Sequence, residues 1–256
     1  MVIALDVGNN RTKLAVFQGH QMLYRVALLT DPYAETPELK HFLKLFLEEY
    51  QVNTESLEGA CLSCVVAPLS EKWSQALYEM TDEKPILVSG SQGNGGLDFA
   101  VDDPNEVGGD LIADAVGALS EFGSCCFIAD LGTCDKYILV DSDSAFGGCA
   151  IAPGMRMGAR ALRGGTAALP EVGFSPLGKA VGKNTESAIR AGLLQGAAER
   201  ASGMAKRFQE EAKYPLRFVL TGGNARFVKD LLPEFEYDED LLLIGLNAIF
   251  HAERGR

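Results

Sequence analysis

Apolar residues near the start of the chain fall into short runs and then adopt a helical spacing. Two runs within residues 3–17, separated by a polar turn with a glycine, predict a β-hairpin, and residues 21–29 predict a third strand. Over residues 39–47 apolar side chains recur at the i, i+3, i+4 spacing of an amphipathic helix. The remaining elements expected up to residue 88 are a strand over 59–66, a helix over 70–80 and a strand over 85–88.

The second half of the chain repeats this order of elements. Residues 126–131 and 136–140 predict another hairpin, and residues 146–154 predict a third strand that ends at a turn. The elements expected after it are a helix over 155–162, a long helix from residue 185, a strand from 217 with a glycine turn opening a helix, and a final apolar helix over 241–250. Self-similarity at this large spacing indicates two related domains.

The turn of the first hairpin carries polar groups suited to a phosphate and a metal ion. Gly8 lets backbone N–H groups approach a ligand closely, and Asn9 and Lys13 lie beside it in the sequence. Asp6, at the end of the strand, is placed to hold a hydrated Mg²⁺, which proteins bind with one or two carboxylates plus substrate phosphates. An ordinary hairpin with Asp and Asn as turn formers explains this copy as well.

A second turn of the same plan opens the second half of the chain. Asp130-Leu131-Gly132-Thr133 follows a strand, and Lys136 begins the next one. Two such turns facing one cleft are difficult to explain by turn chemistry alone. They indicate a nucleotide clamped between two lobes.

The order of elements also predicts the fold. Three strands, a helix, a strand, a helix and a strand is the order of a ribonuclease-H-like domain, the building block of the actin, hexokinase and Hsp70 superfamily. We therefore expect an α/β fold with two ribonuclease-H-like domains and a cleft between them. The expected domains are residues 1–113 and 114–256, and the final helix, 241–254, is expected to pack back on the first domain.

Composition limits the partners of this chain of 256 residues. It is 47% hydrophobic with a formal net charge of −12, which argues against nucleic acid or an anionic membrane as a partner. The start lacks a basic segment and no apolar run approaches the roughly 18 residues of a membrane span, so we expect a cytoplasmic protein. An acidic protein that binds an anionic nucleotide must concentrate cations locally. The candidates are Arg11, Lys13, Lys136, Arg156, Arg160 and Arg163.

Two pairs of glycines mark further candidate contacts with a ligand. Gly108 and Gly109 precede Asp110 near the start of a predicted helix, where the helix dipole favours a charged carboxylate. A helix cap is the simplest role for this aspartate, whereas the glycines open space for a ligand to reach it. Gly222 and Gly223 follow a buried strand, at a junction that suits an adenosine or phosphate contact.

Taken in order, these motifs resemble those of type III pantothenate kinases, also known as the Bvg accessory factor family. The resemblance spans nearly the whole chain and rests on Asp6-Val7-Gly8-Asn9 with Lys13, Pro104 with Glu106 to Asp110, Asp130 to Thr133, Pro153-Gly154, Gly182 with Thr185, and Thr221-Gly222-Gly223. It implies phosphorylation of pantothenate with ATP, the first committed step toward coenzyme A. It also implies a homodimer that uses Mg²⁺ and a monovalent cation such as K⁺ or NH₄⁺.

The resemblance also implies roles for particular residues. Asp110 would be the general base that accepts the proton of the pantothenate hydroxyl. The other implied roles are nucleotide binding by Asp6, Gly8, Asn9, Lys13, Thr133, Gly222 and Gly223, pantothenate binding by Gly108, Gly109 and Thr185, and metal binding by Asp6 and Asp130. These roles fit phosphoryl transfer, which needs charge neutralisation, in-line positioning and a carboxylate to orient the nucleophile.

Three positions depart from the family pattern. Leu111 stands where the family has an arginine expected to grip the substrate or the transferring phosphate. Val101 stands where a tyrosine is expected near pantothenate, and Lys136 replaces a threonine. We expect Lys136 to restore a positive charge at the cleft or to place its ammonium where K⁺ would bind.

These departures leave two alternatives to an active pantothenate kinase. One is a catalytically impaired or regulatory homologue that binds nucleotide or pantothenate without turnover, which the missing arginine favours and the retained Asp6, Asp110 and Asp130 oppose. The other is a related kinase acting on a different hydroxyl compound, because a fold alone does not fix the substrate.

Overall fold

The chain folds into two compact units. The computed structural model describes residues 1–176 and 179–255. The first unit comprises Met1–Glu121 together with the segment that begins at Leu241, and the second unit is Phe122–Asp240. The domain division predicted after residue 113 falls within helix α3 (Gly109–Phe122).

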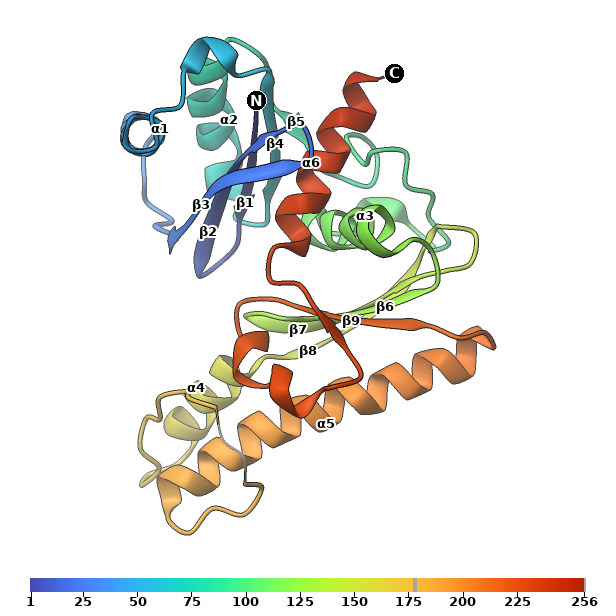
Figure 1. The fold of residues 1–256 in the computed structure, drawn as a ribbon. Coiled ribbons are helices and arrows are strands. Elements are labelled where there is room, and N and C mark those ends of the chain that lie inside the picture. The colour runs from blue at the N-terminus through green and yellow to red at the C-terminus, as the bar shows by residue number, and fades with distance from the viewer. Residues whose placement is uncertain (177–178, 256) are drawn as a thin grey trace. The chain divides into compact units, whose positions relative to one another are not determined.

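The first unit is built on a five-stranded sheet with the strand order β3-β2-β1-β4-β5 (Figure 1). β2 runs antiparallel to both β1 and β3, whereas β4 runs parallel to β1 and to β5. Its strands are β1 (Val2–Val7), β2 (Arg11–Gln18), β3 (Gln21–Leu29), β4 (Gly59–Cys64) and β5 (Ile86–Leu87).

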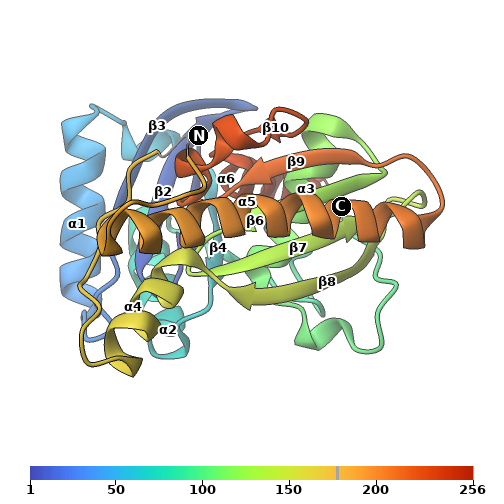
Figure 2. The same cartoon turned by 90° about the horizontal axis from the view of Figure 1, so that it is seen from below.

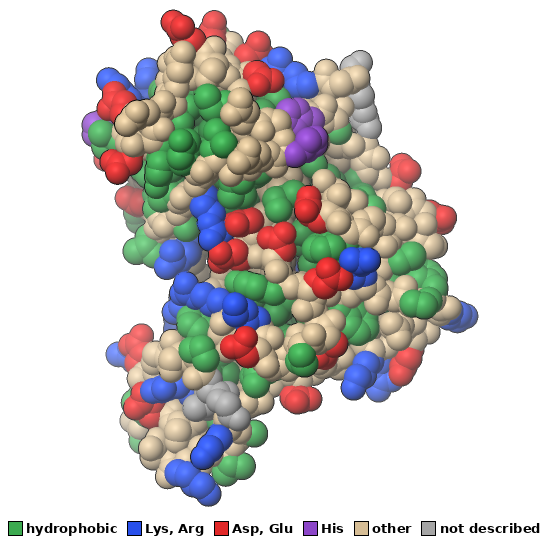
Figure 3. Space-filling model, viewed as in Figure 1, with side chains coloured by type: hydrophobic (Ala, Val, Ile, Leu, Met, Phe, Trp, Pro, Cys, Tyr) green, Lys and Arg blue, Asp and Glu red, His purple; other side chains and the backbone are tan. Residues whose placement is uncertain are grey.

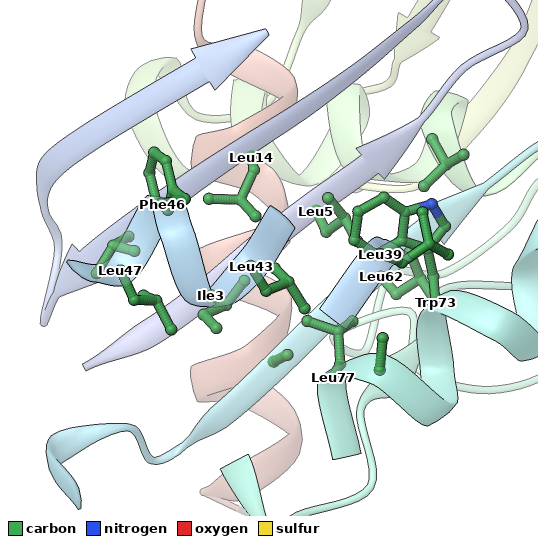
Figure 4. Packing of buried hydrophobic residues seen from close by; sticks show 14 of the residues in the cluster. Ile3, Leu5, Leu14, Leu39, Leu43, Phe46, Leu47, Leu62, Trp73 and Leu77 are labelled. Carbon is green, nitrogen blue, oxygen red and sulfur yellow. The ribbon is translucent and has the colours of Figure 1, made fainter. Parts of the chain in front are cut away.

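Two helices cover one face of this sheet. α1 (Thr36–Glu49) and α2 (Ala67–Thr81) direct their apolar faces onto β1, β2 and β4, as the helical spacing in the sequence predicts (Figure 4). Leu43 of α1 and Trp73 of α2 are almost wholly buried there. This packing fixes the strand ends from which the polar turns emerge.

The last helix, α6 (Leu241–Arg254), packs on β1 and β4 from the other side (Figure 1). It also crosses α3 at very close range. A Cβ atom added at Gly245 would lie 1.8 Å from the carbonyl oxygen of Ala113, so only glycine fits at this crossing. The C-terminal helix is therefore part of the first unit.

The second unit has a five-stranded sheet with the order β10-β9-β6-β7-β8. The long helix α5 lies along one face and contacts β6 and β7 (Figure 2). The elements of this unit are β6 (Cys126–Leu131), β7 (Cys134–Val140), β8 (Phe146–Pro153), α4 (Met155–Gly165), α5 (Thr185–Ala212), β9 (Arg217–Thr221) and β10 (Glu236–Tyr237).

The two sheets share one plan. In each, three consecutive antiparallel strands are followed by two strands that join the sheet in parallel beside the first. The register is equivalent too, because β1 pairs Asp6 with Lys13 and β6 pairs Asp130 with Lys136. The internal repeat predicted from the two polar turns is thus present in the backbone.

One predicted element differs from the structure. The glycine turn after β9 opens only into the short 3-10 turns η3 (Ala225–Phe227) and η4 (Lys229–Leu231), not into an α-helix. Pro233 explains why no helix continues past Leu232, because a proline disfavours the helical region at the residue before it and Leu232 has φ −125° and ψ 58°. Two further 3-10 turns, η1 (Thr54–Ser56) and η2 (Pro104–Glu106), lie in the first unit.

Candidate active site

The hairpin between β1 and β2 presents the first group of predicted site residues. The N–H of Gly8 donates to the carbonyl oxygen of Arg11 at 3.0 Å, which closes the turn and leaves Asn9 exposed. Asp6 lies one residue before the end of β1 and is only 6% exposed. Lys13, half-buried opposite it on β2, has no ion-pair partner within residues 1–176 and 179–255. A carboxylate and an available cation thus flank the turn.

The first unit brings this hairpin close to the start of α3. Ser63, at the end of β4, donates its hydroxyl proton to Asp6 Oδ1 at 3.2 Å. A Cβ atom added at Gly109 would lie 3.4 Å from Ser63 Oγ and 2.8 Å from the carbonyl oxygen of Val88. The absence of a side chain at Gly109 therefore lets the helix begin against the strand ends. Ser63 was not predictable as a site residue, because a serine in an apolar strand can have many structural roles.

Asp110 lies in the first turn of α3, which begins at Gly109. Its Oδ1 accepts a hydrogen bond from the N–H of Leu111 at 3.0 Å, and its side chain is partly buried. This position places the carboxylate inside the helix and not at the preceding cap. A carboxylate at this position can act as a general base for a hydroxyl group that binds within hydrogen-bond distance of it.

In the second unit, Asp130 and Lys136 form an ion pair across β6 and β7. Lys136 Nζ lies 2.5 Å from Asp130 Oδ2, and the two side chains are 14% and 8% exposed. A charged side chain that is this well buried needs a partner of opposite charge. Removing either Asp130 or Lys136 would therefore leave the other charge uncompensated. An ammonium group therefore stands at the carboxylate for which the family resemblance implies a monovalent cation.

The turn after β9 approaches this aspartate closely. Gly222 has a φ of +94°, and an added Cβ atom would lie 2.2 Å from Asp130 Oδ1, so both the conformation and the space require glycine. Nothing lies within 4 Å of the Cβ position of Gly223, which leaves its backbone accessible. The β9 turn thus adjoins the Asp130 turn, and the contact of Gly222 and Gly223 with a nucleotide stays a prediction.

Asn224 ties the β9 turn to the Gly132–Thr133 turn. It is 6% exposed, its N–H donates to Leu131 O at 2.8 Å, and its Nδ2 donates to Gly132 O at 2.6 Å. Sequence analysis missed this residue. One feature of the sequence could have pointed to it: an asparagine directly follows the glycine pair. Buried backbone carbonyl groups at such a turn need hydrogen-bond donors, which an amide side chain supplies.

Helix α4 begins at the same turn. The N–H of Gly154 donates to Thr133 O at 3.2 Å, and an added Cβ atom at Gly154 would lie 2.5 Å from that oxygen. The helix has no side-chain cap at its start. Its first N–H groups therefore lie close to Thr133, where an anion can accept from them.

A buried ion pair lies behind this turn. Asp135 is 0% exposed on β7 and pairs with Arg200 of α5, which also donates to Tyr137 Oη and to Pro153 O at 3.0 Å each. Burial raises the pKa of Asp135 to about 6, against the opposing effect of Arg200. The pair joins α5 to the sheet beside the turn, and sequence analysis did not identify it.

Thr185 is placed differently from the other predicted residues. It is the first residue of α5 and is exposed, and the cap is Asn184, whose side chain accepts from the N–H of Ser187 at 2.9 Å. In the part of the chain that the structure describes, Thr185 forms no hydrogen bond to any other predicted site residue. Its role in pantothenate binding stays a prediction.

Two of the three positions that depart from the family pattern carry apolar side chains, Leu111 and Val101. Leu111 is buried in α3, so this position supplies apolar packing and no cation, and Val101 is half-buried. Asp6 remains as a single carboxylate of the kind that holds hydrated Mg²⁺ together with phosphates. Over residues 1–176 and 179–255, no three His, Cys, Asp or Glu side chains are grouped to enclose a metal ion by themselves.

Acidic and basic side chains are interspersed on the face shown in Figure 3. Within residues 1–176 and 179–255, no helix has the length and apolar character needed to cross a membrane.

Comparison with known proteins identifies the family. The model of the type III pantothenate kinase family matches residues 2–207. A type III pantothenate kinase of Thermus thermophilus is 36% identical over 260 aligned positions that cover 100% of both chains.

Solved structures show the same fold. A putative Baf family transcriptional activator from Campylobacter jejuni aligns with a TM-score of 0.60 and 16% identity, covering 99% of this chain and 100% of that one. An activator of 2-hydroxyisocaproyl-CoA dehydratase from Clostridium difficile, solved with bound ADPNP, aligns with a TM-score of 0.55 and 12% identity, covering 99% and 96%. The predicted fold of two ribonuclease-H-like domains is confirmed, and the chain belongs to the type III pantothenate kinase family.

Proposed function

We propose that this protein transfers the terminal phosphoryl group of ATP to the primary hydroxyl of pantothenate. The products are ADP and 4′-phosphopantothenate, and the reaction is the first step of coenzyme A biosynthesis. Membership of the family supports this reaction. The structural observation that carries it is the arrangement in the first unit, where Ser63 donates to the Asp6 carboxylate and also lies close to Gly109, the residue before Asp110 in α3.

Asp110 is the general base in this mechanism. The hydroxyl oxygen of pantothenate attacks the terminal phosphorus, the bond from phosphorus to the bridging oxygen breaks, and ADP leaves. Asp110 accepts the hydroxyl proton from its position in the first turn of α3. Gly108 and Gly109 present bare backbone to the substrate on one side, and Thr185 supplies a further contact.

The two polar turns bind the nucleotide. Lys13 neutralises phosphate charge, and the backbone N–H of Asn9 donates to a phosphate oxygen. Gly8, whose own N–H closes the turn on Arg11 O, has no side chain and lets the phosphate approach closely. The other nucleotide contacts are made by Thr133, Gly222 and Gly223. Asp6 would hold Mg²⁺, which offsets the charge that develops on the phosphates when it is bound.

Lys136 takes the place of the monovalent cation in this proposal. Its ammonium already neutralises Asp130 at 2.5 Å, so a potassium ion at that carboxylate would compete with a tethered charge. We therefore propose that turnover requires neither K⁺ nor NH₄⁺. Following its family, the chain works as a homodimer, for which sedimentation would give about twice the chain mass of 27.4 kDa.

Release of ADP measured with ATP, Mg²⁺ and pantothenate tests the proposed reaction. The wild-type protein should turn over pantothenate, and Asp110→Asn should reduce kcat by at least about 100-fold while ATP binding is retained, because general base catalysis is lost. Asp230→Asn, an exposed change of the same kind in η4, is the control and should behave as wild type. ATP binding by the wild-type protein without turnover of pantothenate would contradict the proposal and favour a regulatory homologue.

A further inference from the structure

Arg156 is held in place by two uncharged groups, an amide and an aromatic ring. It is the second residue of α4, and its Nε donates to Asn224 Oδ1 at 3.2 Å. Its guanidinium carbon lies 5.5 Å from the centroid of the Phe174 ring. The side chain is exposed, and no carboxylate pairs with it in residues 1–176 and 179–255. Both terminal nitrogens therefore remain available to a ligand.

Two other exposed arginines of the second unit are neutralised by carboxylates. Arg163 pairs with Glu171, and Arg207 pairs with Glu210. Arg156 is instead oriented by a neutral amide and an aromatic ring, which fix the guanidinium plane without cancelling its charge. In a chain with a net charge of −12, a cation fixed in this way is suited to an anion.

The position of this guanidinium is set by the Gly132–Thr133 turn. Asn224 accepts from Arg156 with one side-chain atom and donates with the other to Gly132 O at 2.6 Å. The start of α4 bonds to the same turn through Gly154 and Thr133. Because Asn224 is buried and has a second bond through its backbone, this link is rigid. Arg156 is thus two hydrogen bonds from the turn that carries the predicted phosphate contact.

We infer that Arg156 binds the phosphate groups of the nucleotide through its two terminal nitrogens. This inference rests on the proposed function and adds a phosphate-binding residue to it. Guanidinium nitrogens match a pair of phosphate oxygens in a bidentate geometry, which an ammonium group does not reproduce. A lysine at this position has a single side-chain nitrogen, so it could not bind the Asn224 amide through one nitrogen and the phosphate through two others.

Binding of ATP and of adenosine to purified variants, measured by titration calorimetry, tests this inference. Arg156→Ala should weaken ATP binding by at least about tenfold and leave adenosine binding unchanged, since only ATP carries phosphates. Arg156→Lys should fall between wild type and Arg156→Ala. Arg207→Ala removes one positive charge from an exposed site in α5 and should match wild type, which controls for the change in net charge.

The possible results distinguish a failure of this inference from a failure of the proposed function. Unchanged ATP affinity in Arg156→Ala would overturn the inference, and so would an equal loss for ATP and adenosine, which indicates structural damage. If the wild-type protein phosphorylates pantothenate in either case, the proposed function stands. A wild-type protein that binds no ATP would overturn both.

Discussion

Lys136 and Asp130 are bound to each other so closely that either charge alone would be left poorly solvated in the second unit. The arrangement explains how this chain tolerates a lysine at a position where the family resemblance implies threonine. The side chain adds a permanent cation where other members are expected to recruit one from solution.

Replacing this lysine should create a dependence on monovalent cations. We expect the wild-type rate to be the same with Na⁺, K⁺ or NH₄⁺, and we expect Lys136→Ala to be slow in Na⁺ and partly restored by K⁺ or NH₄⁺, which can approach Asp130. Rates of ADP release at constant ionic strength measure the effect. Lys206→Ala, an exposed change in α5, is the control. Strict K⁺ dependence of the wild-type protein would contradict this role.

Asp135 makes the stability of the second unit depend on pH. Its pKa is raised by burial from an ordinary 3.8 to about 6 in the folded protein, so the folded state binds more protons than the unfolded state between these values. The free energy of unfolding should therefore fall as pH rises from about 4 to about 6, by up to about 3 kcal/mol, and show no further change from this group above pH 6.

Substitution isolates the contribution of this carboxyl group. Asp135→Asn keeps an oxygen acceptor for Arg200 and removes the titration, so its unfolding free energy should change less between pH 4 and pH 6. Urea unfolding at several pH values measures the difference. Asp143→Asn, in an exposed turn, should keep the wild-type slope. An identical slope for wild type and Asp135→Asn would show that Asp135 is not responsible.

At the scale of elements, the crossing of α3 and α6 holds the start of α3 in place. The helix that carries Asp110 touches α6 backbone to backbone at Gly245, and a Cβ atom at Gly117 would lie 2.3 Å from Leu241 O. Helices that approach this closely depend on glycine, because any side chain forces them apart. The position of the proposed base is therefore set partly by residues far away in sequence.

Gly245→Ala should destabilise the protein by about 2–3 kcal/mol or more, because its Cβ atom would meet Ala113 O at 1.8 Å. Gly203→Ala in α5 is the matched control, since nothing lies within 4 Å of its Cβ position. That change should stabilise the helix by up to about 1 kcal/mol. Thermal and urea unfolding distinguish the two, and equal effects would contradict the close crossing.

At the scale of the whole molecule, the two ends of the chain belong to the same unit. β1 begins at Val2 and α6 ends at Arg254, and the helix packs directly on the strand. The second unit is inserted between them in the sequence. The first unit is therefore complete only after α6 has been made.

Deletion of the segment from Leu241 onward should damage the first unit selectively. Amide hydrogen exchange in β1 and β4 should speed up strongly, because these strands lose the helix that covers them, whereas β6 and β7 should change much less. Deletion of residues 255–256 alone keeps all of α6, including Arg254, which donates to Glu58 O before β4; this control should leave exchange in both sheets unchanged. Equal acceleration in the two sheets would indicate that the units do not unfold separately.

Much of this fold and part of the candidate site were predictable from local sequence patterns. Alternating apolar runs and helical spacing depend on residues close together in the chain, and they predicted nearly every strand and helix. The glycine turns at Gly8 and Gly222 were predictable for the same reason, since a backbone conformation is chosen locally. The short strand β10 and the 3-10 turns after β9 escaped because they are too short to show a period.

The sequence by itself determined the duplicated carboxylate turns, the order of elements and, through them, the family. Only the tertiary structure decided that Ser63 touches Asp6, that Asn224 holds Arg156, and that Lys136 neutralises Asp130 at close range. The physical reason is distance along the chain. Arg156 and Asn224, for example, are far apart in the sequence, and no local pattern of residues relates them. Such contacts form only when the sheets have assembled.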